Sequence, residues 1–79
     1  IVTPNPTTGE FSVYVKLNKK RNLSLVVFDA TGIRMFTQNF EDVQEVTLPG
    51  SLANAAAGLY IVRAVTEAEA KEVRLIVNR

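Results

Sequence analysis

Nucleophilic catalysis needs a Ser, Thr or Cys side chain beside a base, and this 79-residue sequence contains neither His nor Cys. A Ser–Lys pair is the arrangement that remains, and Ser12 and Lys16 fall on one face of a predicted strand. At a rise of about 3.3 Å per residue, however, four residues separate these side chains by about 13 Å. The sequence therefore does not predict a hydrolase.

The carboxylates of the sequence fall mainly in two predicted turns. They are Glu41, Asp42 and Glu45 in one turn, and Glu67, Glu69 and Glu72 in the other. A glycosidase needs two carboxyl groups facing each other across a cleft, and a small domain filled by its own side chains leaves no such cleft. A calcium site would need oxygen ligands spaced more closely than in this sequence. We interpret both groups as solvated turn charges, and we expect no metal and no cofactor.

The overall charge is nearly balanced. Nine Lys and Arg residues and eight Asp and Glu residues give a net charge of +1, whereas nucleic-acid-binding domains carry a basic excess. Residues 19–21 (Lys-Lys-Arg) could contact an anionic surface such as lipopolysaccharide, but basic residues in a turn also keep it soluble and block edge pairing. We favour the second interpretation, and we expect neither a nucleic-acid partner nor a small-molecule substrate.

Hydrophobic alternation predicts that strands build the whole domain. Residues 11–17 alternate apolar and polar side chains, as in a half-buried strand, and residues 23–29 are apolar on both faces, as in a central strand. The polar residues 18–22 separate the two. Residues 29–32 (Asp-Ala-Thr-Gly) predict a hairpin into a strand over residues 33–40, because Gly32 accommodates the positive φ of a short turn.

The second half of the sequence continues the same pattern. Residues 43–48 predict a short edge strand that Pro49 and Gly50 end. Residues 51–58 contain four alanines but are too short for a stable helix, so we expect a loop with one helical turn, pinned by Leu52. Strands follow over residues 59–65 and 73–77, joined by residues 66–71. With a short strand at residues 1–3, this gives one all-β domain (1–79) of about seven strands, the pattern of a two-sheet sandwich.

Two segments carry an unusual density of residues that restrict or free the backbone. In residues 4–9, Pro4 and Pro6 hold the residues before them extended, and Gly9 lets the chain turn into the next strand. In residues 57–60, Gly58 lets the loop enter a strand, and Tyr60 can bury its ring while its hydroxyl bonds the loop backbone. Each segment taken alone predicts only architecture.

The order of these segments along the chain is more specific than any one of them. Pro4-Asn5-Pro6-x-x-Gly9 is followed by Leu25-x-x-Phe28-Asp29-x-x-Gly32, then by Leu52 and Gly58-x-Tyr60-x-Val62, and last by an apolar strand that ends in a basic residue. From about Val2 to Arg79 this series resembles the C-terminal sorting domain of the type IX (Por) secretion system of Bacteroidetes.

The resemblance implies an immunoglobulin-like sandwich and a non-catalytic label for an exported cargo protein. It implies passage through the periplasm and across the outer membrane, with the type IX translocon as a partner. It also implies a surface sortase that removes the domain and attaches the cargo to lipopolysaccharide at the cell surface. We therefore expect a larger catalytic or adhesive region, headed by an export signal, before Ile1.

We expect the last strand to be the element that the secretion machinery reads. If it lies at a sheet edge, its unpaired N–H and C=O groups can pair with a receptor strand, while alternate side chains face opposite ways. An exposed edge would also permit a weak homodimer through strand pairing. The predicted recognition residues are Val73, Arg74, Leu75, Ile76, Val77, Asn78 and Arg79.

The alternative is a passive spacer or a carbohydrate-binding module of a larger extracellular enzyme. Carbohydrate-binding surfaces present exposed aromatic rings, but this sequence has no Trp, and only Tyr14 falls on an outward-facing position of a clearly alternating strand. Glycan binding is thus disfavoured, whereas the spacer has the same sequence pattern as the sorting domain.

Overall fold

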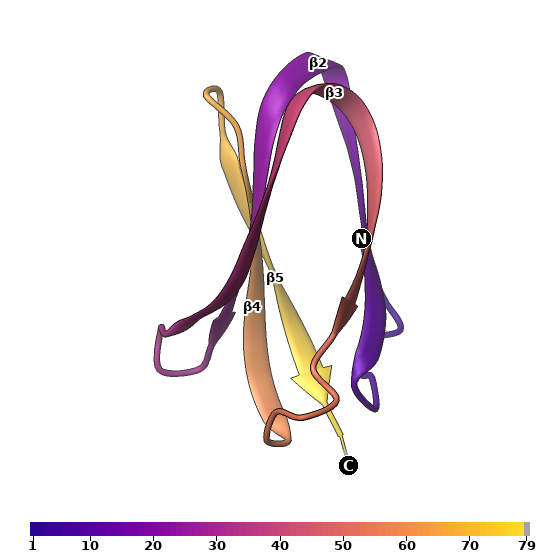
Figure 1. Cartoon of the computed structure of the whole chain (residues 1–79), viewed down its shortest axis with the longest axis vertical. Helices are drawn as coiled ribbons and strands as arrows, with labels where there is room; N and C mark the ends of the chain where they lie inside the picture. The colour runs from indigo at the N-terminus through magenta and orange to yellow at the C-terminus, as the bar shows by residue number, and fades with distance from the viewer. Residues whose placement is uncertain (79) are drawn as a thin grey trace.

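The computed structural model describes residues 1–78, which form antiparallel strands and no helix (Figure 1). The strands are β1 (Val2–Thr3), β2 (Glu10–Asp29), β3 (Arg34–Ser51), β4 (Gly58–Val65) and β5 (Ala70–Val77). They follow the order β1-β2-β4-β5, and β3 pairs with the other side of β2. The all-β antiparallel fold predicted from the sequence is therefore confirmed. Within the described residues, no helix is long and apolar enough to span a membrane.

The β2–β3 hairpin is curled so that it contributes to both layers of the molecule. The two strands pair along almost their whole length, from Glu10↔Ser51 to Phe28↔Arg34, and both arch over the top of the molecule in Figure 1. β1 pairs with the first half of β2, and β4 pairs with its second half. One curled sheet thus supplies two layers that face each other.

The number of strands differs from the sequence-based expectation, because the described residues form five strands rather than seven. The expected strands 11–17 and 23–29 are the two halves of β2, and 33–40 and 43–48 fall within β3 and the turn before it. Residues 18–22, expected to interrupt the strand, lie in the arch, where the pairing register shifts on both sides of Arg21. Their polarity reflects exposure at a bend rather than the end of a strand.

Pro49 and Gly50 were expected to end a strand, but β3 continues through both to Ser51. A Pro is tolerated there because β3 is an edge strand that pairs only with β2. Gly50 stands opposite Phe11, and a Cβ on Gly50 would lie 2.6 Å from Cζ of the Phe11 ring. The aromatic ring therefore occupies the space above the glycine.

The turns before β3 and β4 agree with the expectations. The Asp29 C=O accepts a hydrogen bond from the Gly32 N–H at 3.0 Å, and Gly32 has a φ of 90°, which confirms the predicted hairpin. In the 51–58 loop, the Ala55 N–H donates to the Leu52 C=O at 3.0 Å, which makes one turn, and Leu52 is buried as predicted. β5 begins at Ala70, inside the connection expected over residues 66–71.

The core lies between the two halves of the curled sheet. Buried positions alternate with half-buried or exposed ones in the first half of β2, and with half-buried ones in its second half and in β4. The buried apolar side chains are Val2, Phe11, Val13, Leu23, Leu25, Val27, Leu52, Tyr60, Val62, Leu75 and Val77.

Candidate recognition edge

The strand predicted to be recognised, β5, lies at the end of the strand order and pairs with β4 from Gly58↔Val77 to Val65↔Ala70. Leu75 and Val77 face the core and are buried, whereas Arg74, Ile76 and Asn78 are exposed. The predicted alternation of the last strand is therefore confirmed. Arg79 lies outside the described residues.

The segment of residues 4–7 runs beside the outer edge of β5. The Thr7 N–H donates to the Ile76 C=O at 2.9 Å, and the Asn78 N–H donates to the Thr7 C=O at 2.8 Å. These two bonds form a parallel bridge between Thr7 and Val77. The first and the last segments of the described chain are thus joined through their backbones.

The side chain of Asn5 continues this bridge along β5. Its Nδ2 donates to the Arg74 C=O at 2.6 Å, and its Oδ1 accepts from the Ile76 N–H at 3.1 Å. A residue in a parallel ladder bonds the two residues that flank its partner in this same way. The Asn5 carboxamide therefore takes the place of a peptide group beside Leu75.

These contacts correct the expectation that the whole last strand offers unpaired backbone groups. From the Arg74 C=O to the Asn78 N–H, the outer edge of β5 is bonded to Asn5 and Thr7. Only the first half of the strand, from Ala70 to Val73, has no strand or loop backbone bonded along its outer edge among the described residues. A partner that reads residues 74–78 must therefore contact their side chains or displace the 4–7 segment.

Thr7 fixes the loop that carries these bonds, although we did not single it out from the sequence. It is 3% exposed, and its hydroxyl donates to the Glu10 C=O at 2.5 Å and accepts from the Gly9 N–H at 3.1 Å. Gly9 has a φ of 143°, and a Cβ there would lie 3.1 Å from Cα of Ala53. A Thr two residues before a turn glycine is a recognised local signal for such a hydroxyl-closed turn.

Tyr60 forms the contact predicted for it. Its side chain is 5% exposed, and its hydroxyl donates to the Ala56 C=O at 2.5 Å. Gly58, with a φ of 148°, begins β4 two residues earlier. Tyr60 therefore holds the 51–58 loop against the start of its own strand.

Asp29 closes the β2–β3 turn through its side chain. Its Oδ1 accepts hydrogen bonds from the Thr31 hydroxyl at 2.6 Å, the Thr31 N–H at 2.9 Å and the Ile33 N–H at 3.0 Å. The Thr31 hydroxyl, followed by the Ile33 N–H, lowers the pKa of this carboxyl below its ordinary value. The ionised form of Asp29 is thus the one that the turn favours.

The profile of the secretion system C-terminal sorting domain family, that of the type IX (Por) system, matches residues 2–78. The chain belongs to this family. A search of curated proteins found none that matches this chain. The chain is therefore a sorting signal of the type IX secretion system, which directs export across the outer membrane to the cell surface or to release.

The motifs of the sorting domain converge at one end of the molecule, the lower end in Figure 1. Asp29 of β2 stands opposite Tyr60 of β4, and Tyr60 stands opposite Leu75 of β5. The Asn5 side chain then bonds on both sides of Leu75. Four segments far apart in the sequence thus meet in a single row across the sheet.

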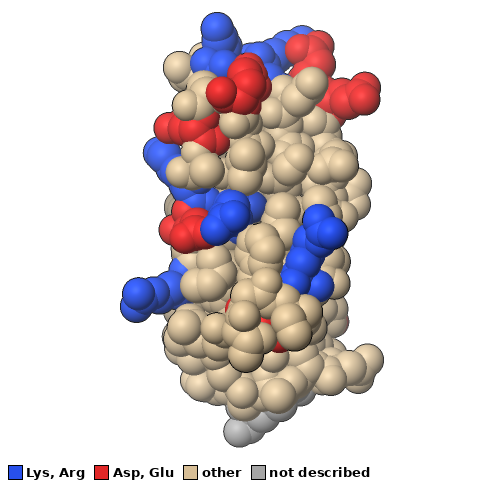
Figure 2. All heavy atoms as spheres, turned by 90° about the vertical axis from the view of Figure 1, so that its left-hand side faces the viewer, with Lys and Arg blue, Asp and Glu red and all other residues tan. Residues whose placement is uncertain are grey.

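Many charged side chains of the sorting domain lie toward the opposite end, at the arch and the β4–β5 turn. On the face shown in Figure 2, charged side chains crowd toward the top of the view, and the lower end is mostly uncharged. Of the basic run 19–21, Arg21 is ion-paired with Glu67 at 2.7 Å, while Lys19 and Lys20 are exposed. Exposed charged residues of the arch and of the β4–β5 turn are Lys19, Lys20, Glu41, Asp42, Glu67 and Glu69.

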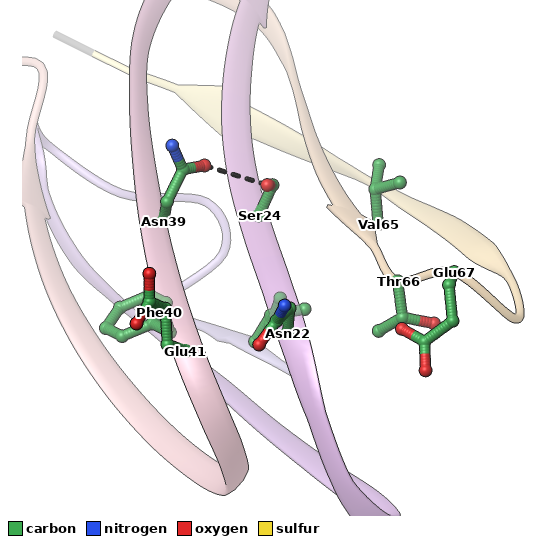
Figure 3. Close-up of a pocket in the computed structure, with 9 residues that line it drawn as sticks. Asn22, Ser24, Asn39, Phe40, Glu41, Val65, Thr66 and Glu67 are labelled. Carbon is green, nitrogen blue, oxygen red and sulfur yellow. Dashed lines mark hydrogen bonds between the residues drawn. The ribbon is translucent and has the colours of Figure 1, made fainter.

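A wide, open hollow of about 780 Å³ lies beside this charged end, between β3 and the β4–β5 turn (Figure 3). The Ser24 hydroxyl donates to Asn39 Oδ1 at 2.8 Å, and Glu41 and Glu67 lie on opposite sides of the hollow. A hydrogen bond from its own backbone N–H, followed by the Arg21 guanidinium, lowers the pKa of Glu67. Within residues 1–78, no three acidic side chains gather closely enough to hold a metal ion. The hollow therefore presents polar side chains, of which Ser24 and Asn39 bond each other.

Proposed function

We propose that the secretion machinery recognises this sorting domain through exposed side chains of β5, in the part of the strand whose outer edge is bonded to residues 4–7. The observation that carries the proposal is the double hydrogen bond between Asn5 and the backbone around Leu75. A cargo label must be recognised irrespective of the protein fused to it, so its recognised surface must be present in every folded copy. The joined segments 4–7 and 74–78 form such a surface, because it exists only when both segments are in place.

The recognised residues under this proposal are those predicted from the sequence, 73–79. Ile76 is 38% exposed on the outward face of β5, and Val73, on the inward face, is 39% exposed. Arg74 and Asn78 are exposed on the same face as Ile76. The type IX translocon would then contact a mixed apolar and polar row, and a surface sortase would act on the cargo side of the domain.

The domain is, in the same proposal, non-catalytic and immunoglobulin-like. Two halves of a curled sheet facing each other over an apolar core, with Tyr60 bonded to the preceding loop, support the immunoglobulin-like interpretation. The Ser24 hydroxyl donates to an amide oxygen of Asn39, which is not a base, and the carboxylates do not cluster among the described residues. Both observations support a label rather than an enzyme. A weak homodimer through the free half of β5 or through β3 remains a prediction, and size measurements across concentration would test it.

The proposal is tested by fusing the domain to a reporter in a strain that has the secretion machinery. Ile76→Thr alters an exposed apolar side chain within the proposed surface, and Ile33→Thr makes the same change at a 63% exposed side chain next to the β2–β3 turn. We expect Ile76→Thr to reduce the reporter at the cell surface at least fivefold and Ile33→Thr to leave it unchanged. Both purified domains should keep the thermal midpoint of the original chain to within about 2 °C.

Two outcomes would contradict the proposal. Equal export of Ile76→Thr and the unaltered fusion would show that this side chain is not read. Retention of the unaltered fusion inside the cell or in the periplasm would favour the passive spacer.

A further inference from the structure

Burial along the inner face of β2 changes at the point where β1 stops. Phe11 and Val13 are each 4% exposed, but Val15 and Leu17, which continue the same inward-facing row, are only half-buried. β1 pairs with β2 at Ser12 and Val13 and reaches no further than Tyr14. The core is thus covered on this side only as far as β1 extends.

The opposite layer loses its cover at the same level. On β5, Leu75 and Val77 are buried, whereas Val73 of the same inward row is 39% exposed. On β4, Val62 is buried and Ala64 is half-buried. Both layers therefore present apolar side chains that lack a covering element.

These side chains line a groove between the two layers. A hollow of about 230 Å³ is bordered by Val13, Val15, Ala64 and Val73 together with Ile1 and other residues of β1, β2, β4 and β5. A second hollow of about 70 Å³ shares Val15 and Ala64 with it and extends the groove to Leu17. The groove begins at Ile1 and follows β2 toward the arch.

The pairing of β1 with β2 ends beside this groove at a hydrogen-bonded pair of residues, Ile1 and Tyr14. The Tyr14 N–H donates to the Ile1 C=O at 2.8 Å, and the Ile1 ammonium donates to the Tyr14 C=O at 3.0 Å, as in a hydrogen-bonded antiparallel pair. Among the described residues, no strand pairs with this side of β2 between Tyr14 and Ser24, where β4 begins to pair. The β1–β2 ladder therefore ends at Tyr14, whereas β2 itself continues.

We propose that the segment connecting the cargo to this sorting domain extends β1 along β2 and fills the groove. This rests on the proposed function, because a C-terminal sorting domain follows its cargo and the connecting chain enters at Ile1. The residue immediately before Ile1 stands opposite Val15, and the second residue before it exchanges backbone hydrogen bonds with Lys16. Because side chains alternate in a strand, the first of these points into the apolar groove, as Val2 does, and the second points outward.

The connecting segment is a better occupant than a separate chain. It already runs antiparallel to β2, and its covalent link gives it an effective concentration on the order of millimolar. Backbone hydrogen bonds hold it largely irrespective of its sequence, and the groove adds one preference, for an apolar residue next to Ile1. The sorting domain would thus fix the last residues of its connector as well as present its own C-terminal strand.

The test compares the 79-residue chain with two versions that carry three added residues of the same composition. One version adds Ser-Asp-Val before Ile1, so that Val points into the groove, and the other adds Ser-Val-Asp, so that Asp does. We expect Ser-Asp-Val to slow hydrogen exchange of the Lys16 amide at least tenfold and to raise the thermal midpoint by several degrees. We expect Ser-Val-Asp to give smaller changes in both, because its carboxylate would lose hydration among Val15, Ala64 and Val73. Lys16 and Lys71 also border the groove, but both are exposed, and ion pairs with exposed lysines stabilise little.

Other results would overturn the proposal. Lys16 exchange as fast with Ser-Asp-Val as in the 79-residue chain would show that the connector does not pair, and equal protection by both extensions would show that the groove selects no residue. Protection of Lys16 in the 79-residue chain that rises with protein concentration would assign this edge to a second copy. None of these measurements involves export, so they leave the test of β5 recognition unaffected.

Discussion

Asn5 accepts a hydrogen bond through its Oδ1 from the backbone N–H of Ile76, a residue 71 positions later in the chain. Its Nδ2 donates to the Arg74 C=O, so one side chain bonds the strand on both sides of Leu75. This arrangement gives the Pro-Asn-Pro motif a physical role. The motif presents an amide side chain to the terminal strand and closes an edge that would otherwise be open to pairing.

Asn5→Ala removes both of these hydrogen bonds. At about 0.5–1.5 kcal/mol for each bond, we expect a loss of about 1–3 kcal/mol in the free energy of unfolding, measured by urea denaturation. The Ile76 amide should exchange faster with solvent, because its acceptor is gone. Asn54→Ala, at an exposed position of the 51–58 loop, is the control. An unchanged exchange rate at Ile76 would contradict the bonding that we describe.

Tyr60→Phe removes the hydroxyl that bonds the Ala56 C=O and retains the buried ring. We expect a loss of about 1–2 kcal/mol in the free energy of unfolding, since the Ala56 C=O loses its donor. Tyr14→Phe is the matched control, because the Tyr14 hydroxyl bonds Glu45 on the exposed surface and should contribute less than about 0.5 kcal/mol. Equal losses in the two variants would argue against a structural role for the Tyr60 hydroxyl.

The sequence predicted the local features of the fold well, because their causes lie within a few residues. Alternation identified the inward faces of the first half of β2 and of β5, and Asp29 with Gly32 identified the hairpin. The Tyr60 hydroxyl contact was also predictable, because its acceptor, Ala56, lies four residues away. In each of these cases, one short segment contains both partners.

Features that depend on distant partners could not be predicted in this way. Polar residues 18–22 are exposed both where a strand ends and where a curled strand bends, and only the pairing of Arg21 with Val43 shows that it bends. Similarly, the partners of Asn5 are backbone groups of β5, which carry no side-chain signal. The edge position of β5, which the sequence left open, is thus given by the strand order, and the closure of half of that edge was not foreseen.

Asp29→Asn should make the acid stability of the domain less dependent on pH. Because the hydrogen bonds of the turn lower the folded-state pKa of Asp29, its ionised form stabilises the fold above the unfolded pKa of about 4. This stabilisation is lost as the pH falls through the folded pKa. We expect the difference in unfolding free energy between the original chain and the variant to shrink below about pH 4, whereas Glu67 titrates in both. A difference independent of pH from 7 to 2 would contradict this assignment.

Gly50→Ala places a methyl group where the Phe11 ring lies, because its Cβ would stand 2.6 Å from Cζ of that ring. The ring is part of the core, 4% exposed, and can move only by disturbing its neighbours. We expect a loss of about 1–3 kcal/mol in the free energy of unfolding, the usual range for overpacking. The same change in a Phe11→Leu background should cost clearly less, because the smaller side chain leaves room for the methyl group. Additive losses in this double-mutant cycle would show that the ring and the glycine are not coupled.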